Sequence, residues 1–315
     1  MIHFWNTLNI QITGDTAVTL GKFDGLHRGH QKLLDDIKRK KAEGYQTVVF
    51  TFARPPMALL TGKPQRTLLV NEERREVLEQ MNIDYLIEYP FTETVSHMLP
   101  EYFVKEILIE QLHMKYLAAG EDFGFGYQRS GNTNLLRQLA PKYGYEITVM
   151  EKETDGIREI SSTYIKEELS LGHIEKVNEL LGRTFSVQGT IVHGKELGRK
   201  IGIPTINLYP PDEKLLPPKG VYCAKTEIDG RVYEGIANIG IKPTVTDQRR
   251  MTIEVHLFDI CEQLYGKKAK VRLYHFVRPE CKFDSVDQLK EQMERDIAAG
   301  KQYFDKNNGF VKLKK

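Results

Sequence analysis

One short segment near the amino terminus combines residue types that bind phosphate. Residues 20–30 read Leu-Gly-Lys-Phe-Asp-Gly-Leu-His-Arg-Gly-His. The glycines allow the backbone to approach a bound phosphate closely. His27 and His30 are three residues apart, so at the start of a helix they can lie on one face and donate hydrogen bonds to the same phosphate. We therefore take His27 and His30 as candidate catalytic residues, and as candidate nucleotide-binding residues Gly21, Lys22, Phe23, Asp24, Gly25 and Gly29.

The flanking sequence predicts the elements that must position this segment. Residues 16–20 form a short apolar run typical of a buried parallel strand, and residues 31–37 have apolar side chains at helical spacing. The free amides and the dipole of a helix start favour anionic oxygen. The spacing His-x-Gly-His resembles the nucleotidyltransferase superfamily, whose enzymes transfer a nucleoside monophosphate to an acceptor phosphate and release pyrophosphate. The alternative is a glycine-rich turn with surface histidines.

A second glycine-rich and basic segment lies in the other half of the chain. Its candidate nucleotide-binding residues are Gly194, Lys195, Gly198, Arg199 and Lys200. Thr205 and Asn207 follow two residues apart, so on a strand their side chains share one face. A hydroxyl and an amide carbonyl are hard oxygen ligands that suit Mg²⁺ already held by nucleotide phosphates. The residues alone fit equally well with a polar edge strand that follows a flexible hairpin.

Length, cysteine content and charge limit the class of protein. A chain of 315 residues is long enough for two separate cores. Its three cysteines are widely spaced and form no paired motif, which favours a reducing compartment over a disulfide framework or a zinc site. We find no leader pattern and no apolar run long enough for a membrane span, so we expect a soluble cytoplasmic protein. A net charge of +2 is too small to indicate nucleic-acid binding.

The pattern of elements changes near residue 183. Before it, strand-like runs at residues 47–52, 85–88, 116–119 and 146–150 alternate with helical stretches such as 72–81 and 100–112. This alternation predicts a parallel sheet, with further helices at 162–169 and 174–181. After it come short strands at residues 185–191, 221–228, 231–239, 251–258 and 270–276, then a helix at 286–303. These predict an antiparallel barrel or sandwich, and we place the domains at residues 1–183 and 184–315.

The order of motifs along nearly the whole chain resembles the bacterial bifunctional riboflavin kinase/FMN adenylyltransferase family, also called FAD synthetases. Besides the segment around His27, the matching stretches are residues 120–126, 129–131, 160–163, 198–207, 220–222, 238–240, 254–257, 264–267 and 278–283. The resemblance implies an α/β nucleotidyltransferase domain with a Rossmann-like parallel sheet, followed by an all-β riboflavin-kinase barrel with a C-terminal helix. It also implies that ATP, riboflavin and FMN are substrates, that FAD is a product and that Mg²⁺ is the cofactor.

The family's site residues can be carried over position by position. In the second domain, Glu254 matches the general base for the riboflavin 5′-hydroxyl, Thr205 and Asn207 match magnesium-binding positions, and Asn238 and Arg278 lie in motifs that contact flavin. A surface carboxylate on an alternating strand is the alternative for Glu254. In the first domain, the matches to a second phosphate-binding segment are Ser161, Ser162, Thr163 and Lys166, and those to the flavin-side loop are Asp122, Phe123 and Phe125. A helix N-cap and ordinary core packing are the respective alternatives.

Two departures from the family pattern fall in the adenylyltransferase half. Arg54 stands where the family usually has histidine, and Lys166 stands where it usually has arginine. Lysine loses the bidentate fork of arginine, and Arg54 is a cation that does not exchange a proton. We therefore predict intact riboflavin phosphorylation, and adenylylation of FMN that is slower or that differs in its nucleotide preference.

Three other functions remain open from the residues. They are a riboflavin kinase with a degenerate or regulatory N-terminal domain, a different nucleotidyltransferase whose barrel only binds substrate, and a non-catalytic flavin or RNA-binding regulator. The expected partners are the small-molecule substrates, with no nucleic acid, no membrane and at most weak association into a homo-oligomer.

Overall fold

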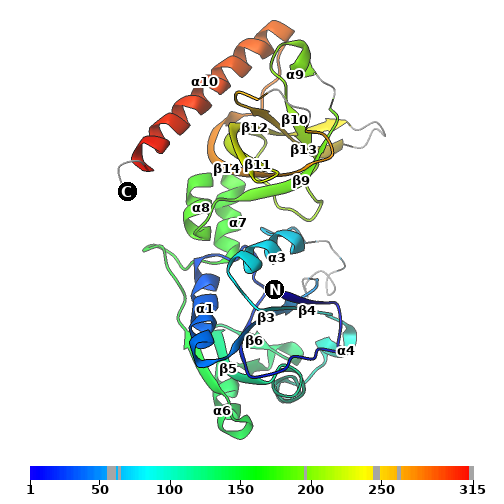
Figure 1. Ribbon diagram of the computed structural model, residues 1–315, viewed down its shortest axis with the longest axis vertical. Coiled ribbons are helices and arrows are strands. Elements are labelled where there is room, and N and C mark those ends of the chain that lie inside the picture. The colour runs from blue at the N-terminus through cyan, green and yellow to red at the C-terminus, as the bar shows by residue number, and fades with distance from the viewer. Residues whose placement is uncertain (55–61, 63–64, 195–196, 244–248, 261–263, 312–315) are drawn as a thin grey trace. The chain divides into compact units, whose positions relative to one another are not determined.

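The computed structural model describes residues 1–54, 62, 65–194, 197–243, 249–260 and 264–311, and they divide into two compact units (Figure 1). The units are Met1–Ser162 and Thr163–Lys315. The elements of the first unit are β1 (Ile2–Trp5), β2 (Thr16–Leu20), α1 (Arg28–Arg39), η1 (Lys40–Glu43), β3 (Gln46–Phe52), α3 (Asn71–Gln80), β4 (Tyr85–Tyr89), α4 (Glu93–Ser96), α5 (Pro100–Tyr102), η2 (Phe103–Ile109), β5 (Met114–Gly120), β6 (Gly124–Phe125), η3 (Tyr127–Arg129), β7 (Gly131–Asn132), α6 (Thr133–Tyr143) and β8 (Glu146–Met150).

A six-stranded parallel sheet forms the centre of the first unit. Its strand order is β1-β4-β3-β2-β5-β8, and every pairing in it is parallel. From β2 the chain adds β3 and β4 on one side and then crosses to β5 and β8 on the other. In such sheets ligands bind at the carboxyl ends of the strands where the order reverses, here between β2 and β5. The Gly21–His30 loop follows β2 directly and so lies at this point.

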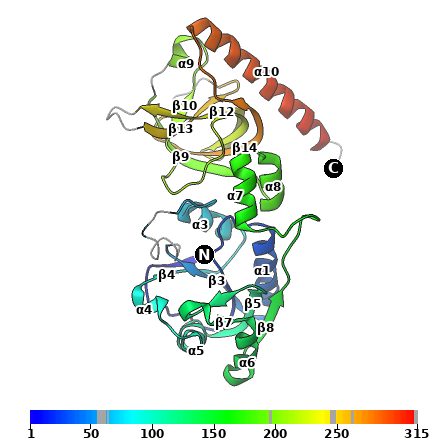
Figure 2. The same ribbon diagram turned by 180° about the vertical axis from the view of Figure 1, so that it is seen from behind.

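Apolar side chains cover both faces of this sheet, as burial of a parallel sheet requires. On one face Ala17 belongs to a core cluster with Leu34 and Ile37 of α1 and Leu78 of α3. On the other face the core cluster includes side chains of β2, η2 and α6, among them Val18, Ile107 and Leu136. Figure 2 shows the unit from behind, with α6 beside β7 and β8. The alternation of neighbouring β2 residues between the two clusters follows from the two-residue period of a strand.

The second unit is a closed antiparallel barrel with helices around it. The barrel order is β10-β13-β12-β11-β14-β9, and α10 packs on β11, β12 and β14 (Figure 1). Beneath α10, Val221, Cys223 and Ile236 form an apolar cluster with Phe304 of the helix. Its elements are α7 (Ser162–Leu171), α8 (Ile174–Leu181), β9 (Ser186–Val192), α9 (Leu197–Lys200), β10 (Ile206–Leu208), β11 (Gly220–Ile228), β12 (Arg231–Pro243), β13 (Arg249–Leu257), β14 (Lys268–Pro279) and α10 (Val286–Val311).

The predicted fold class is confirmed, with differences in detail. The helix expected at residues 100–112 is a short α5 that continues as the π-helical η2. The helices α7 and α8, which we place in the first domain from the sequence, belong largely to the second unit. Asn178 of α8 donates through Nδ2 to the Leu273 carbonyl of β14 at 2.9 Å, and its Oδ1 accepts from the Phe185 amide at 2.6 Å. Contacts therefore divide the chain at 162/163 rather than at 183/184.

No helix in the described part of the chain is long and apolar enough to cross a membrane.

Candidate functional site

The loop between β2 and α1 has an unusual backbone conformation. Phe23, Gly25 and Leu26 adopt positive φ angles of 48°, 89° and 44°. Glycine adopts this region readily, but phenylalanine and leucine do so only where the surroundings impose it. Both side chains are fully buried in the core, which holds the strained backbone in place. Strain of this kind is typical of ligand-binding loops.

His27 and His30 come together at the start of α1. His27 is the N-cap residue, and its ring stacks on that of His30 with centroids 3.7 Å apart. Burial, with His27 beside it, holds the pKa of His30 well below its usual value of 6.5. The first turn of α1 carries no acidic residue. A stacked imidazole pair at a positively polarised helix start is suited to donating hydrogen bonds to an anion.

Contacts from neighbouring segments fix the rest of this loop. The Asp24 carboxylate accepts a hydrogen bond from the Leu68 amide, and its carbonyl accepts one from the Ser162 hydroxyl, both at 2.7 Å. The Lys22 side chain is exposed, while its carbonyl accepts a hydrogen bond of 3.4 Å from Thr51 Oγ1. The structure thus brings Ser162 into contact with the loop between β2 and α1, and its role in phosphate binding stays a prediction.

The other predicted members of the second phosphate-binding segment are placed differently. Ser161 is half-buried just before α7. Thr163 and Lys166 lie on α7 and belong to the second unit, where Thr163 is exposed and Lys166 is half-buried. Of this segment, Ser162 has a side-chain hydrogen bond to the loop, and the nucleotide contacts of all four residues stay predictions.

Two basic residues of α1 have an acidic partner that the sequence motifs do not include. Glu153 accepts a hydrogen bond from Arg28 Nη2 at 2.8 Å and forms an ion pair with Lys32. Lys32, with Arg28 beside it, lowers the pKa of this carboxyl group. No sequence pattern links residues 125 positions apart, so only the fold could reveal this pair.

The loop after β5 reaches the same edge of the sheet. Asp122 is exposed and lies 3.5 Å from Lys152 Nζ, and Phe123 is half-buried. Phe125 is buried, packs against Phe103 and stacks on Phe123 with ring centroids 5.6 Å apart. This placement leaves Asp122 and Phe123 available for a ligand and favours a core role for Phe125.

In the barrel, strand register brings three polar side chains into one row. Asn207 of β10 pairs with Glu254 of β13, and Glu254 pairs with Asn238 of β12. Residues directly opposite each other on neighbouring antiparallel strands share a face. Because Asn238 is two residues from Ile236, which packs beneath α10, the row lies on the outer face of the barrel. Asn207 is buried, whereas Glu254 and Asn238 are half-buried.

The glycine-rich loop packs directly against this row. A Cβ at Gly194 would lie 2.4 Å from Asn207 Nδ2, and one at Gly198 would lie 2.3 Å from the Ile203 carbonyl and 3.6 Å from Thr205 Cγ2. Only glycine allows these approaches. Arg199 and Lys200 are exposed, so their charges are available to a phosphate, and Lys195 lies outside the described residues.

The oxygens of this region match the needs of a magnesium ion in part. Thr205 and Asn207 offer a hydroxyl and an amide oxygen at one end of the row, and the Glu254 carboxylate is next to Asn207 in register. No group of three or more His, Cys, Asp and Glu residues in the described part of the chain is arranged to hold a metal. Magnesium held mainly by phosphates and water needs only one or two such protein oxygens.

Arg278 is committed to a partner on α10. Its Nε and Nη2 donate to the two carboxylate oxygens of Asp296, at 2.8 and 2.6 Å, and Asp296 is buried. These hydrogen bonds with Asp296 raise the pKa of Arg278. Val221 pairs with both Asn238 and Arg278, so Arg278 is in line with the polar row. The geometry favours a role in docking α10 beside the row, and direct flavin contact by Arg278 or Asn238 stays a prediction.

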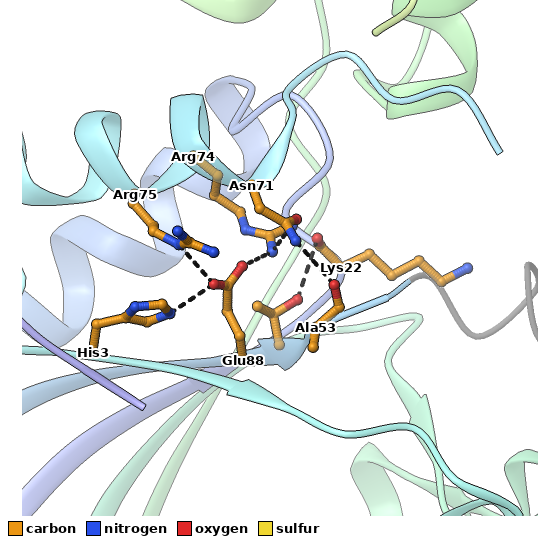
Figure 3. Close-up of polar contacts among 8 residues, drawn as sticks. His3, Lys22, Ala53, Asn71, Arg74, Arg75 and Glu88 are labelled. Carbon is orange, nitrogen blue, oxygen red and sulfur yellow. Dashed lines mark hydrogen bonds and ion pairs between the residues drawn. The ribbon is translucent and has the colours of Figure 1, made fainter. Parts of the chain in front are cut away.

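A buried ionic cluster in the first unit was missed by sequence reasoning. The Glu88 carboxylate of β4 is fully buried and is contacted by Arg74 and Arg75 of α3 and by His3 of β1 (Figure 3). The sequence could have indicated this cluster, because Glu88 lies within an otherwise apolar strand and a buried carboxylate requires nearby cations.

Comparisons with known proteins match the two halves of the chain to two different family models. A family model for FAD synthetase matches residues 9–164, and one for riboflavin kinase matches residues 181–304. A bifunctional riboflavin kinase/FMN adenylyltransferase from Listeria monocytogenes is 34% identical over 293 residues, covering 92% of this chain and 93% of its own. The protein of that description from Escherichia coli K12 is 35% identical over 291 residues, covering 91% and 92%. A crystal structure described as a macrolide-efflux protein from Streptococcus pneumoniae aligns with a TM-score of 0.85 and 29% identity, over 95% of this chain and 98% of that one.

Proposed function

The chain belongs to the family of bifunctional riboflavin kinases/FMN adenylyltransferases, and from this premise we propose that it phosphorylates riboflavin to FMN and then adenylylates FMN to FAD. One observation carries the proposal for both reactions. Each matched region contains a separate constellation suited to its chemistry, the histidine pair at α1 in one and the Asn207–Glu254–Asn238 row in the other.

The kinase reaction is assigned to the barrel. Glu254 accepts the proton of the riboflavin 5′-hydroxyl while that oxygen attacks the γ-phosphorus of ATP, and ADP leaves. A general base must first be within reach of the hydroxyl, and a carboxylate in the middle of a fixed row of side chains meets that need. Gly194 and Gly198 let the loop approach the row, so that Arg199 and Lys200 can offset phosphate charge. Phosphoryl transfer depends mainly on such positioning and charge neutralisation.

Magnesium fits the same end of the row. The Asn207 side chain lies where only a glycine at position 194 leaves space, so its amide group is next to the glycine-rich loop of the barrel. We expect the hydroxyl of Thr205, two residues earlier, to be the second oxygen ligand. When bound, the ion supplies positive charge to the transferred phosphate and to the leaving group. The protein holds these two oxygens in place, and the glycines of the loop leave the space next to them free of side-chain atoms.

The adenylyl transfer is assigned to the first unit. The FMN phosphate attacks the α-phosphorus of ATP, the bond to the β-phosphate oxygen breaks, and pyrophosphate leaves. His27, His30 and the amides at the start of α1 stabilise the charge that develops on these oxygens. Ser162 holds the Asp24 carbonyl and so helps to fix the loop. Asp122 and Phe123 are the flavin-side candidates.

Arg54 and Lys166 set the expected balance of the two rates. Both replace residues that are usual in the family, and both fall in residues assigned to adenylylation. We therefore expect FMN to accumulate before FAD. The alternative of a kinase with a degenerate first domain is disfavoured, since the histidine pair and its anion-compatible helix start are intact.

The direct test is a time course of purified enzyme with riboflavin, ATP and Mg²⁺, with FMN and FAD separated by chromatography. We expect FMN first, then FAD with release of pyrophosphate. Failure to form FAD from supplied FMN would contradict the assignment of the first unit. Formation of FAD as fast as FMN would contradict the predicted slower adenylylation, and Arg54→His should raise the FAD rate if Arg54 causes it.

A further inference from the structure

The buried cluster around Glu88 makes contact with the loop edge of the first unit. Arg74 is 6% exposed, and its Nη2 contacts both Glu88 and the Asn71 side-chain oxygen, the latter at 2.9 Å. Asn71 in turn donates through Nδ2 to the Ala53 carbonyl at 3.0 Å. Figure 3 shows this chain of contacts, which runs from β4 through α3 to the end of β3.

The Ala53 carbonyl marks the point at which the chain leaves the sheet. The Ala53 amide donates a hydrogen bond to the Tyr89 carbonyl at 2.9 Å. The next residue, Arg54, is exposed. This point adjoins the phosphate loop, because the Gly21 amide donates to the Phe50 carbonyl of β3 at 3.2 Å and Thr51 contacts the Lys22 carbonyl. Arg54 and the phosphate loop therefore start from the same edge of adjacent strands β2 and β3.

Packing alone does not require so costly an arrangement. Burial of a carboxylate and an arginine is expensive, and a matched set of apolar residues would often be at least as stable. Among the described residues, Arg74 Nε has no hydrogen-bond partner, which adds to that cost. The cluster instead fixes the orientation of its side chains. Glu88 orients the Arg74 guanidinium, and Arg74 holds the side-chain oxygen of Asn71, so that the Asn71 Nδ2 points to the Ala53 carbonyl.

From these contacts we propose that Asn71 and Arg74 are positioning residues for adenylyl transfer. They fix the Ala53 carbonyl and thereby set the place from which the Arg54 guanidinium meets the ATP phosphates. The inference rests on the proposed adenylylation of FMN. It predicts that Asn71 acts on ATP through Arg54 and has no effect on the kinase reaction of the same polypeptide.

A double-mutant cycle on the full-length protein tests this coupling. We expect Asn71→Ala to raise the KM for ATP in FAD formation roughly tenfold, because a displaced Arg54 would lose one charge-assisted hydrogen bond to a phosphate. Riboflavin phosphorylation should be unchanged. Arg54→Ala should have a similar effect, and the double variant should be no worse than Arg54→Ala alone, because residues that act through one another are not additive. Glu72→Gln, an exposed carboxylate on the same helix, is the matched control and should leave both reactions unchanged.

Asn71→Asp provides an arm that preserves folding. It keeps an acceptor for Arg74, replaces the donor to Ala53 with an oxygen and adds a negative charge next to the Arg74 guanidinium. It should therefore raise the same KM while circular dichroism stays that of wild type. An unchanged KM in both Asn71 variants, or additive effects with Arg54→Ala, would overturn the inference. If wild-type protein formed no FAD from FMN, the proposed function itself would fail, which is a separate outcome.

Discussion

The two candidate sites are built in opposite ways. In the first unit the reactive residues His27 and His30 are close in sequence, and a strained loop at a strand-to-helix junction brings them into contact. In the barrel, Asn207, Asn238 and Glu254 are far apart in sequence, with 47 positions between the first and the last, and they meet only through strand register. The first site depends on local backbone conformation with distant support, and the second depends on pairing and on close approach of glycines.

Because of this difference, the two sites should be sensitive to different kinds of substitution. A change in the buried support of the first unit should alter its stability and leave the barrel unaffected. A substitution at Gly194 or Gly198 should displace the glycine-rich loop of the barrel without unfolding the strands of the barrel. Each of the following tests compares the two reactions or the two unfolding transitions within one polypeptide.

The largest expected effect is on stability, from Glu88→Gln. The substitution leaves Arg74 buried without its counter-charge, and loss of one partner of a buried pair costs about 3–5 kcal/mol. Calorimetry or denaturant unfolding should show a lower transition for the first unit and an unchanged one for the barrel. Glu72→Gln, exposed on the same region of α3, should leave both transitions in place. Equal shifts in the two transitions would show that the cluster does not support the first unit separately.

The next effect is on the kinase reaction, from Gly198→Ala. A Cβ at this position meets the Ile203 carbonyl at 2.3 Å, and a backbone atom cannot move aside without displacing the loop. A misplacement on the scale of 1 Å lowers rates by roughly 100-fold. Riboflavin phosphorylation should fall by that order while adenylylation of supplied FMN is unchanged. Gly230→Ala, where no atom lies within 4 Å but φ is 77°, controls for backbone strain elsewhere in the barrel.

The smallest effect is the dependence of stability on pH through His30. Its pKa is lowered in the folded state, so below pH 6.5 the unfolded chain binds a proton that the folded chain does not. The free energy of unfolding of the first unit should therefore fall by up to about 1.4 kcal/mol per pH unit as the pH drops below 6.5. Denaturant melts at pH 7.5 and 5.5 measure this. His30→Asn should lose that part of the dependence. His113→Asn, at an exposed position directly before β5, should keep it.

The contiguous parts of both sites could be predicted from sequence, and the long-range parts could not. Strand 16–20 was predicted with correct bounds because its apolar run is followed directly by a glycine-rich segment. Helix α1 begins at Arg28, three residues before the apolar spacing that predicted it. The row around Glu254 was reached only through the family resemblance, since nothing in a single strand tells which neighbour it pairs with. Edge strand β1 and helix α6 were not predicted, and α6 carries Pro141 within it, which usually marks a helix end.

The ion pairs of Glu88, Glu153 and Asp296 illustrate the same limit. Each carboxylate and its arginine are distant in sequence and come into contact only through tertiary packing. Their sequence separation ranges from 13 residues for Arg75 with Glu88 to 125 for Arg28 with Glu153. For Arg278 the motif indicated flavin contact, but the bidentate pair with Asp296 uses the fork that such contact would need. A motif therefore identifies a position better than it identifies the partner of its side chain.

The assignment of one reaction to each unit is tested most directly by His30→Ala and Glu254→Gln in parallel. FMN and FAD are separated after incubation with riboflavin, ATP and Mg²⁺, and each variant is also assayed with supplied FMN. We predict that His30→Ala abolishes FAD and spares FMN, and that Glu254→Gln stops riboflavin phosphorylation but still adenylylates supplied FMN. Loss of both activities in both variants, with both proteins folded, would contradict the account.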